Sequence, residues 1–186
     1  MKGMTRPGIA GVLAVCLSCL VLLLIAAARL IPAGTALHVT LAEEDTPVLM
    51  LPLAPGERFT LHYYHSVENA PIWEVHSMDA SGVIFIEEER YEKFGAGMGK
   101  LPGVGRMVQQ GKYEAIVDMH HPVGTFLLRV GSPGVAHTII WRNRRFNLSD
   151  KLPHQRVRFS GRPMTLYQTV LSLTGSGRTG PWPEST

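Results

Sequence analysis

The chain has 186 residues, of which 45% are hydrophobic and 8% are aromatic. This length suggests one domain, or two at most, and the composition excludes an intrinsically disordered chain. The formal net charge is +3, but three basic residues flank an apolar N-terminal run and the rest of the chain is formally neutral, which argues against nucleic acid as a partner.

The N-terminal part of the chain contains an apolar run without charges, GIAGVLAVCLSCLVLLLIAAA, from Gly8 to Ala28. As a helix, about 20 apolar residues span the hydrocarbon core of a bilayer. A signal peptide has a shorter apolar region of about 7–15 residues. The length of the run therefore favours a retained membrane anchor, which comprises residues 1–31. Small residues at Gly34 and Ala36 keep a cleaved signal peptide open as the alternative.

The charges that flank this run predict on which side of the membrane the rest of the chain lies. Lys2 and Arg6 precede the run, whereas only Arg29 follows it closely. By the positive-inside tendency, the N-terminus is cytoplasmic and the remainder of the chain lies outside. Both cysteines, Cys16 and Cys19, lie within the apolar run, so the outer part can form no disulfide and no zinc site that uses sulfur.

After Pro32 the sequence becomes a series of short strand-like segments. Most are rich in Val, Ile, Phe, Tyr and Thr and are separated by Pro, Gly, Asn or Asp. This spacing is typical of an antiparallel β-sandwich or a barrel-like domain. We therefore predict an all-β fold over residues 32–163, preceded by a single transmembrane helix. Residues 164–186 are expected to form a short helix or strand, capped by Thr165 and Gln168, and a disordered tail.

Alternation of side chains along two strands, RFTLHYYH and IWEVHSMD, predicts which residues face the core. In the first strand, Phe59, Leu61 and Tyr63 share one side and are assigned to the core. In the second strand, Trp73 and Val75 share one side, and we expect them in the core as well. This assignment puts the ionisable side chains of the second strand on the opposite face.

The segment that joins these strands, HSVENAP, carries the first candidate site residues. It has the composition of a turn, because Asn69 can hydrogen-bond its own backbone and Pro71 fixes φ. No catalytic residue is assigned, since no nucleophile elbow surrounds Ser66. A metal site is an alternative, although no pair shows a dedicated spacing such as HExxH. Its imidazole and carboxylate ligands would be His65, Glu68, Glu74 and His76.

A glycine-rich segment, FGAGMGKLPGVGRMVQQGK, interrupts the strand pattern between Phe94 and Lys112. It is not a phosphate loop, because Phe94 and Leu101 stand where a Walker A sequence requires Gly and Ser or Thr. Long segments without regular structure tend to be functional or mobile. A flexible crossover and a lid or docking loop both fit this composition.

Three motifs in this order carry a family resemblance: HSVENAPIWE from His65, FGAGMG from Phe94, and LRVG from Leu128 with His137 after it. With them the chain resembles an uncharacterised bacterial family known as domain of unknown function 1850. Genes of that family often lie beside those of TAXI-class TRAP transporters, which take up organic acids through a substrate-binding protein and a membrane permease. The positions that match the family pattern and form the candidate binding site are His65, Ser66, Glu68, Glu74, Phe94, Gly95 and Gly97.

The resemblance implies an accessory role at the membrane and brings no catalytic residue and no cofactor with it. We therefore expect a non-enzymatic protein of the bacterial inner membrane with a periplasmic or extracellular β domain. Its expected partners are the membrane, through the N-terminal helix, and a TRAP-type permease or its substrate-binding protein. The alternative is a β domain that binds a small ligand or a metal.

Overall fold

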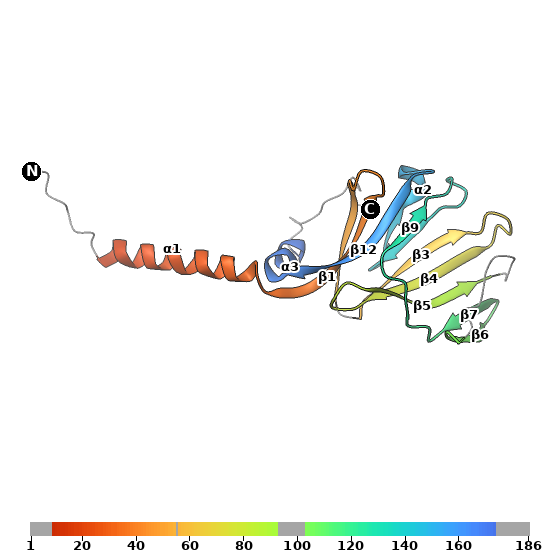
Figure 1. Cartoon of the computed structure of the whole chain (residues 1–186), viewed down its shortest axis with the longest axis horizontal. Coiled ribbons are helices and arrows are strands. Elements are labelled where there is room, and N and C mark those ends of the chain that lie inside the picture. The colour runs from red at the N-terminus through yellow and green to blue at the C-terminus, as the bar shows by residue number, and fades with distance from the viewer. Residues whose placement is uncertain (1–8, 55, 93–102, 174–186) are drawn as a thin grey trace, which may run out of the picture. The chain divides into compact units, whose positions relative to one another are not determined.

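The computed structural model describes residues 9–54, 56–92 and 103–173 (Figure 1). The candidate residues Phe94, Gly95 and Gly97 and the predicted tail lie outside the described residues. The described chain divides into two compact units, residues 9–33 with 164–173 and residues 34–163.

The first unit is helical. α1 (Ile9–Ala28) is long and apolar enough to cross a membrane, by length and composition, and none of its residues is buried. α3 (Leu166–Leu173) begins at the predicted capping box, because the backbone N–H of Thr165 donates to Gln168 Oε1 at 2.9 Å and that of Gln168 donates to Thr165 Oγ1 at 3.4 Å. The terminal element is therefore a helix and not a strand.

The second unit consists of two β-sheets (Figure 1). The strands of the first sheet are, in order, β2 (Pro47–Leu53), β1 (Pro32–Leu41), β12 (Arg156–Thr165) and β9 (Phe126–Arg129). The strands of the second sheet are, in order, β11 (Arg144–Asn147), β10 (Thr138–Trp141), β3 (Arg58–Tyr64), β4 (Pro71–Met78), β5 (Ile84–Tyr91), β7 (Tyr113–Val117) and β6 (Arg106–Gln110), with β8 (His121–Pro122) also paired to β5. All pairs of the second sheet are antiparallel, and a short helix, α2 (Leu148–Lys151), follows β11.

One hydrophobic core joins the two sheets, which makes the unit a β-sandwich as predicted. A column of stacked rings crosses this core. Phe59 and His76 of the second sheet have ring centroids 5.1 Å apart, His76 and Phe126 are 5.6 Å apart, and Phe126 and Phe159 of the first sheet are 4.7 Å apart. Both end rings, Phe59 and Phe159, are buried, so the column is part of the contact between the sheets.

The prediction for Trp73 and Val75 is wrong. Register places Trp73 opposite His62 and Val75 opposite Thr60, on the face of the sheet that points away from the core, where both side chains are half-buried. Side chains that are directly opposite in a pair of strands lie on the same face, so register decides the face of a whole strand. Leu61 of the core face is paired with Glu74, and this pairing puts a glutamate inside the sandwich.

A close approach of two backbones fixes β12 against the turn between β4 and β5. A β-carbon at Gly161 would overlap the carbonyl oxygen of Gly82 and lie 2.7 Å from the sulfur of Met78. We expect Gly161→Ala to lower the free energy of unfolding by about 1–3 kcal/mol, because packed backbone cannot give way. Gly134→Ala is the control, since its β-carbon would meet nothing closer than Ser132 Oγ at 3.9 Å. Equal urea midpoints for the two variants would contradict this packing.

Candidate functional site

The turn between β3 and β4 is closed by His65. Its ring Nδ1 accepts hydrogen bonds from the backbone N–H groups of Glu68, at 3.1 Å, and Val67, at 3.4 Å. The backbone of His65 also bonds Asn69 and Ala70, both at 2.9 Å, and Asn69 has a φ of +47°. Asparagine tolerates this left-handed conformation, so the turn predicted from HSVENAP is present. The imidazole of His65 organises the turn.

His65→Ala is expected to remove two acceptor contacts and to lower the free energy of unfolding by about 0.5–1.5 kcal/mol. His65→Asn retains a side-chain acceptor that can bond backbone N–H groups two and three residues later, and we expect it to recover most of the loss. Thermal unfolding of the three proteins measures both effects. An alanine variant as stable as the original chain would show that the turn closes without His65.

The other candidates of this motif point to different places. The side chains of Ser66 and Glu68 are exposed on the turn, whereas Glu74 lies on β4 and faces the sandwich interior. His76 is buried in the stacked column. The sequence placed these residues side by side, and the structure separates them into a surface turn and an internal polar group.

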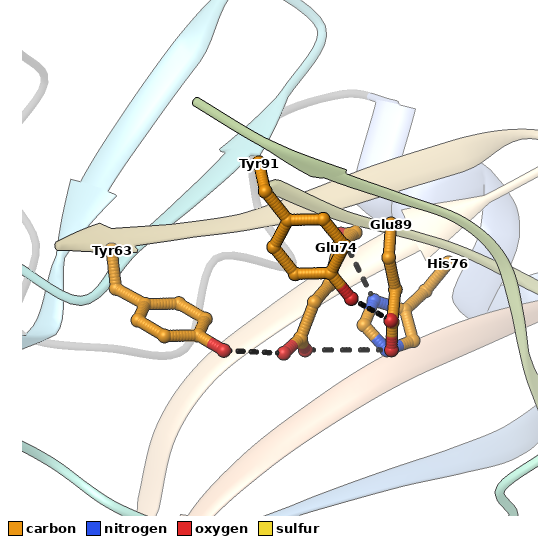
Figure 2. A network of polar contacts seen from close by, with 5 residues as sticks. All are labelled: Tyr63, Glu74, His76, Glu89 and Tyr91. Carbon is orange, nitrogen blue, oxygen red and sulfur yellow. Dashed lines mark hydrogen bonds and ion pairs between the residues drawn. The ribbon is translucent and has the colours of Figure 1, made fainter. Parts of the chain in front are cut away.

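Glu74 is the centre of a polar network formed by three neighbouring strands (Figure 2). Tyr63 of β3 donates its hydroxyl to Glu74 Oε1 at 2.7 Å. The register pairs Glu74 with Glu89 of β5, and the hydroxyl of Tyr91 donates to Glu89 Oε2. Figure 2 shows Tyr63 and His76 on either side of the Glu74 carboxylate, with Glu89 and Tyr91 beside it.

His76 contributes a neutral ring to this network. Its Nδ1 lies 3.2 Å from the backbone carbonyl of Glu74, which can only accept, so Nδ1 carries the proton. Its Nε2 lies 4.0 Å from Glu74 Oε2, too far for a direct hydrogen bond. Burial between aromatic rings lowers the pKa of His76 from 6.5 to about 4, so the imidazole is uncharged at neutral pH.

Burial has the opposite effect on Glu74, since it disfavours the charged form of both groups. It raises the pKa of Glu74 from 4.5 to about 7; the Tyr63 hydrogen bond opposes this rise and the charge of Glu89 adds to it. Burial likewise raises the pKa of Tyr63 and Tyr91 above the usual range, which leaves both hydroxyls protonated as donors. The Glu74 side chain is 22% exposed, so a carboxyl group that titrates near neutral pH is within reach of solvent.

The network continues from Tyr63 toward the motif LRVG. The rings of Tyr63 and His137 are 5.0 Å apart, and His137 Nδ1 accepts a hydrogen bond of 2.9 Å from the backbone N–H of Gly131. Burial lowers the pKa of His137 to about 4, which suits this acceptor role. The backbone N–H of His137 donates to Ser149 Oγ at 3.0 Å. Two motifs that are distant in sequence therefore meet around Tyr63.

A comparison with protein families agrees with these motifs. Residues 59–148 match the family described as Domain of unknown function (DUF1850). The resemblance predicted from the three motifs is thereby confirmed. A search of the curated proteins and a search of the solved structures each found no match.

The DUF1850 match coincides with a structural boundary. It begins at Phe59 in β3, runs through β11 and ends at Leu148, where α2 begins, so among the described strands it covers those of the second sheet apart from Arg58. The turn, the Glu74 network and His137 all lie within it. In the first sheet, β1, β2 and β12 fall outside the match, and only β9 falls inside.

Two members of the network, Glu89 and Tyr91, and a neighbouring carboxylate, Glu87, were missed by sequence reasoning. A register shift between Val75 and His76 pairs those two residues with Glu88 and Ile86, which leaves Glu87 without a partner in the ladder. Ser77 Oγ donates to Glu87 Oε1 at 2.5 Å, and His120 Nδ1 lies 2.9 Å from the same atom. The available signal was three consecutive glutamates in FIEEERY, because a regular strand would send two of them to one face.

The electrostatics of Glu87 differ from those of Glu74. Partial burial pushes the pKa of Glu87 upward, but the hydrogen bonds from Ser77 and His120 outweigh it and hold the pKa below its ordinary value. Glu87 is therefore an ionised structural group, whereas the protonation of Glu74 changes near neutral pH.

The alternative metal site is not assembled in the described part of the chain. Across residues 9–54, 56–92 and 103–173, no group of three or more His, Cys, Asp and Glu side chains could hold a metal ion. His65 and Glu68 belong to the turn, and Glu74 and His76 face the sandwich interior. The turn and the network are thus two separate features of the DUF1850 region.

Proposed function

We propose that this protein is a membrane-anchored, exported accessory protein of an organic-acid uptake system, whose β domain docks on a TRAP-type permease or its substrate-binding protein. The observation that carries the proposal is α1, a helix of 20 residues without charges and without a buried residue. A helix of this length and composition is suited to the hydrocarbon core of a bilayer. The DUF1850 match supports the transporter association through the gene neighbourhood that the resemblance implies.

The turn between β3 and β4 is the part of the candidate motif that a partner can reach. Val67 at its tip is 81% exposed, and Ser66 and Glu68 beside it are exposed as well. The hydrogen bonds to His65 hold the backbone that carries these side chains in one conformation before a partner arrives. Preorganisation of this kind lowers the entropic cost of docking.

Co-purification from native membranes in mild detergent tests the proposal. We expect the full chain to retain the permease or its substrate-binding protein, and Val67→Glu to lose it. The control is Val123→Glu, a surface valine with 36% exposure outside the turn, which should retain the partner. Repeated recovery of the chain without either transporter component would count against the proposal.

A second candidate function is the binding of a small ligand at the Glu74 network. It is favoured by a partly exposed carboxyl group with a pKa of about 7 beside two tyrosine hydroxyls. At pH 8 this carboxylate would prefer a ligand that carries an amine or another hydrogen-bond donor. Calorimetric titration of the full chain with small amines, small carboxylates, zinc and copper tests it. Heat that persists in Glu74→Gln would place the binding elsewhere.

A further inference from the structure

The helical unit contains an apolar groove of about 310 Å³ between α1 and α3. One wall is the α1 face formed by Val21, Leu24, Ile25 and Ala28, which follow each other at helical spacing. The other wall is Leu166, Tyr167 and Val170 of α3. Except for the tyrosine hydroxyl, every side chain that lines the groove is apolar.

Specific contacts hold α3 beside the end of α1. The backbone N–H of Leu166 donates to the carbonyl of Ile31 at 2.7 Å, and Thr169 Oγ1 lies 3.4 Å from the carbonyl of Ala33. The guanidinium group of Arg29 lies 4.8 Å from the centre of the Tyr167 ring, a cation–π contact. α3 is therefore attached to the residues that immediately follow α1.

α3 is amphipathic, and its apolar face is open. Leu166 and Val170 lie one turn apart and are 38% and 49% exposed, whereas Gln168 and Ser172 lie on the other side of the helix. An isolated helix of only eight residues is marginally stable in water. α3 therefore needs an apolar surface against which its exposed apolar side chains can pack. α1 indicates that this surface is lipid, because α1 lines the same groove and is apolar enough to cross a membrane.

We propose that α3 is an interfacial helix on the outer leaflet of the membrane and that the acyl chain of a phospholipid occupies the groove. Interfacial helices bury their apolar face about 5–10 Å into the boundary between headgroups and acyl chains. Arg29, at the end of α1, then lies at the depth of the lipid phosphate, and Tyr167 at the interface that aromatic residues favour. This inference rests on the proposed function in one respect, namely that α1 is retained in the membrane.

Fluorescence quenching in proteoliposomes of phosphatidylethanolamine and phosphatidylglycerol tests the site. Single cysteines are introduced into the full chain in a Cys16→Ser and Cys19→Ser background and labelled with an environment-sensitive dye. Val170→Cys and Leu166→Cys report on the apolar face of α3. Ser172→Cys is the matched control on the polar face of the same helix, and Leu24→Cys reports on α1.

We expect doxyl-labelled acyl chains to quench the dyes at positions 166 and 170 several-fold more than the dye at 172, with blue-shifted emission at 166 and 170. Aqueous iodide should show the reverse order. If iodide quenches all three α3 positions equally and doxyl lipid does not favour 166 and 170, the inference about α3 is wrong. If doxyl lipid still quenches the dye at position 24 in that case, α1 is in the bilayer and the anchor stands. If doxyl lipid does not quench position 24 either, α1 is outside the bilayer, and the anchor and the lipid groove fail together.

Discussion

Phe159→Ala is expected to lower the free energy of unfolding by about 3–5 kcal/mol, the usual cost of removing a buried aromatic side chain. Phe159 is fully buried in β12, and its ring stacks on Phe126 with centroids 4.7 Å apart. The loss has two parts: the apolar surface that leaves the core and the cavity that remains beside Phe126. Urea unfolding of the full chain in detergent micelles, followed by tryptophan fluorescence with buried Trp141 as a reporter, measures it.

Two further variants separate packing from a general effect of substitution. Phe159→Leu retains most of the volume and should cost less than Phe159→Ala. Val67→Ala removes methyl groups from a side chain that is 81% exposed and should change stability by less than about 0.5 kcal/mol. If Phe159→Ala lowered the free energy of unfolding by less than Val67→Ala does, the stacked column would not join the sheets.

Local patterns predicted the fold class because they reflect local constraints. Alternation identified Phe59 and Leu61 as core residues, and both are buried. The residues Asn69 and Pro71 predicted the turn, and the Thr165 and Gln168 pair predicted the cap of α3. Each of these features depends on residues that are near each other in sequence, which is why one sequence suffices to find it.

The candidate site could be predicted only in part, because its assembly depends on register. Glu74 enters the core face through its pairing with Leu61, and no property of the segment IWEVHSMD alone favours a buried glutamate over a buried Trp73. The bulge that isolates Glu87 and puts Glu89 opposite Glu74 arises between two strands. Hydrophobicity favoured Trp73 as the core residue, but the register of the hairpin places Glu74 on the core face instead.

Contacts between segments that are distant in sequence also could not be predicted from the sequence. The stacked column combines residues of β3, β4, β9 and β12, which are far apart in the sequence of the β unit. His137 was recognised as part of a motif, yet its contact with the Tyr63 ring shows why LRVG and HSVENAPIWE belong to one DUF1850 region. The protonation of Glu74 likewise depends on its burial and on Tyr63 and Glu89, which come from two neighbouring strands.

Glu74→Gln is expected to leave the free energy of unfolding unchanged at pH 4.5 and to raise it by up to about 3 kcal/mol at pH 8. This magnitude follows because each unit of pKa shift corresponds to roughly 1.4 kcal/mol. The pKa of Glu74 is raised from 4.5 to about 7, so the folded protein holds this proton more tightly than the unfolded chain does. The stability contributed by the protonated carboxyl is fully present below pH 4.5 and is lost as the pH rises through 7. Glutamine stays neutral across this range, and its side-chain oxygen can still accept the hydrogen bond from Tyr63.

His76 makes the shape of the pH profile a sharper test than stability at one pH. Its pKa is lowered from 6.5 to about 4, so its contribution is present above pH 6.5 and is lost as the pH falls toward 4. Between pH 4.5 and 6.5 the slope from Glu74 opposes those from His76 and His137 in the original chain. Glu74→Gln removes the opposing slope, so its stability should rise more steeply with pH. Urea unfolding at pH 4.5, 5.5, 6.5 and 8 measures these profiles, with Glu68→Gln on the exposed turn as the matched substitution outside the network. If the profile of Glu74→Gln ran parallel to that of the original chain, the Glu74 carboxyl would titrate as it does in water, and the small-ligand function that depends on its raised pKa would lose its basis.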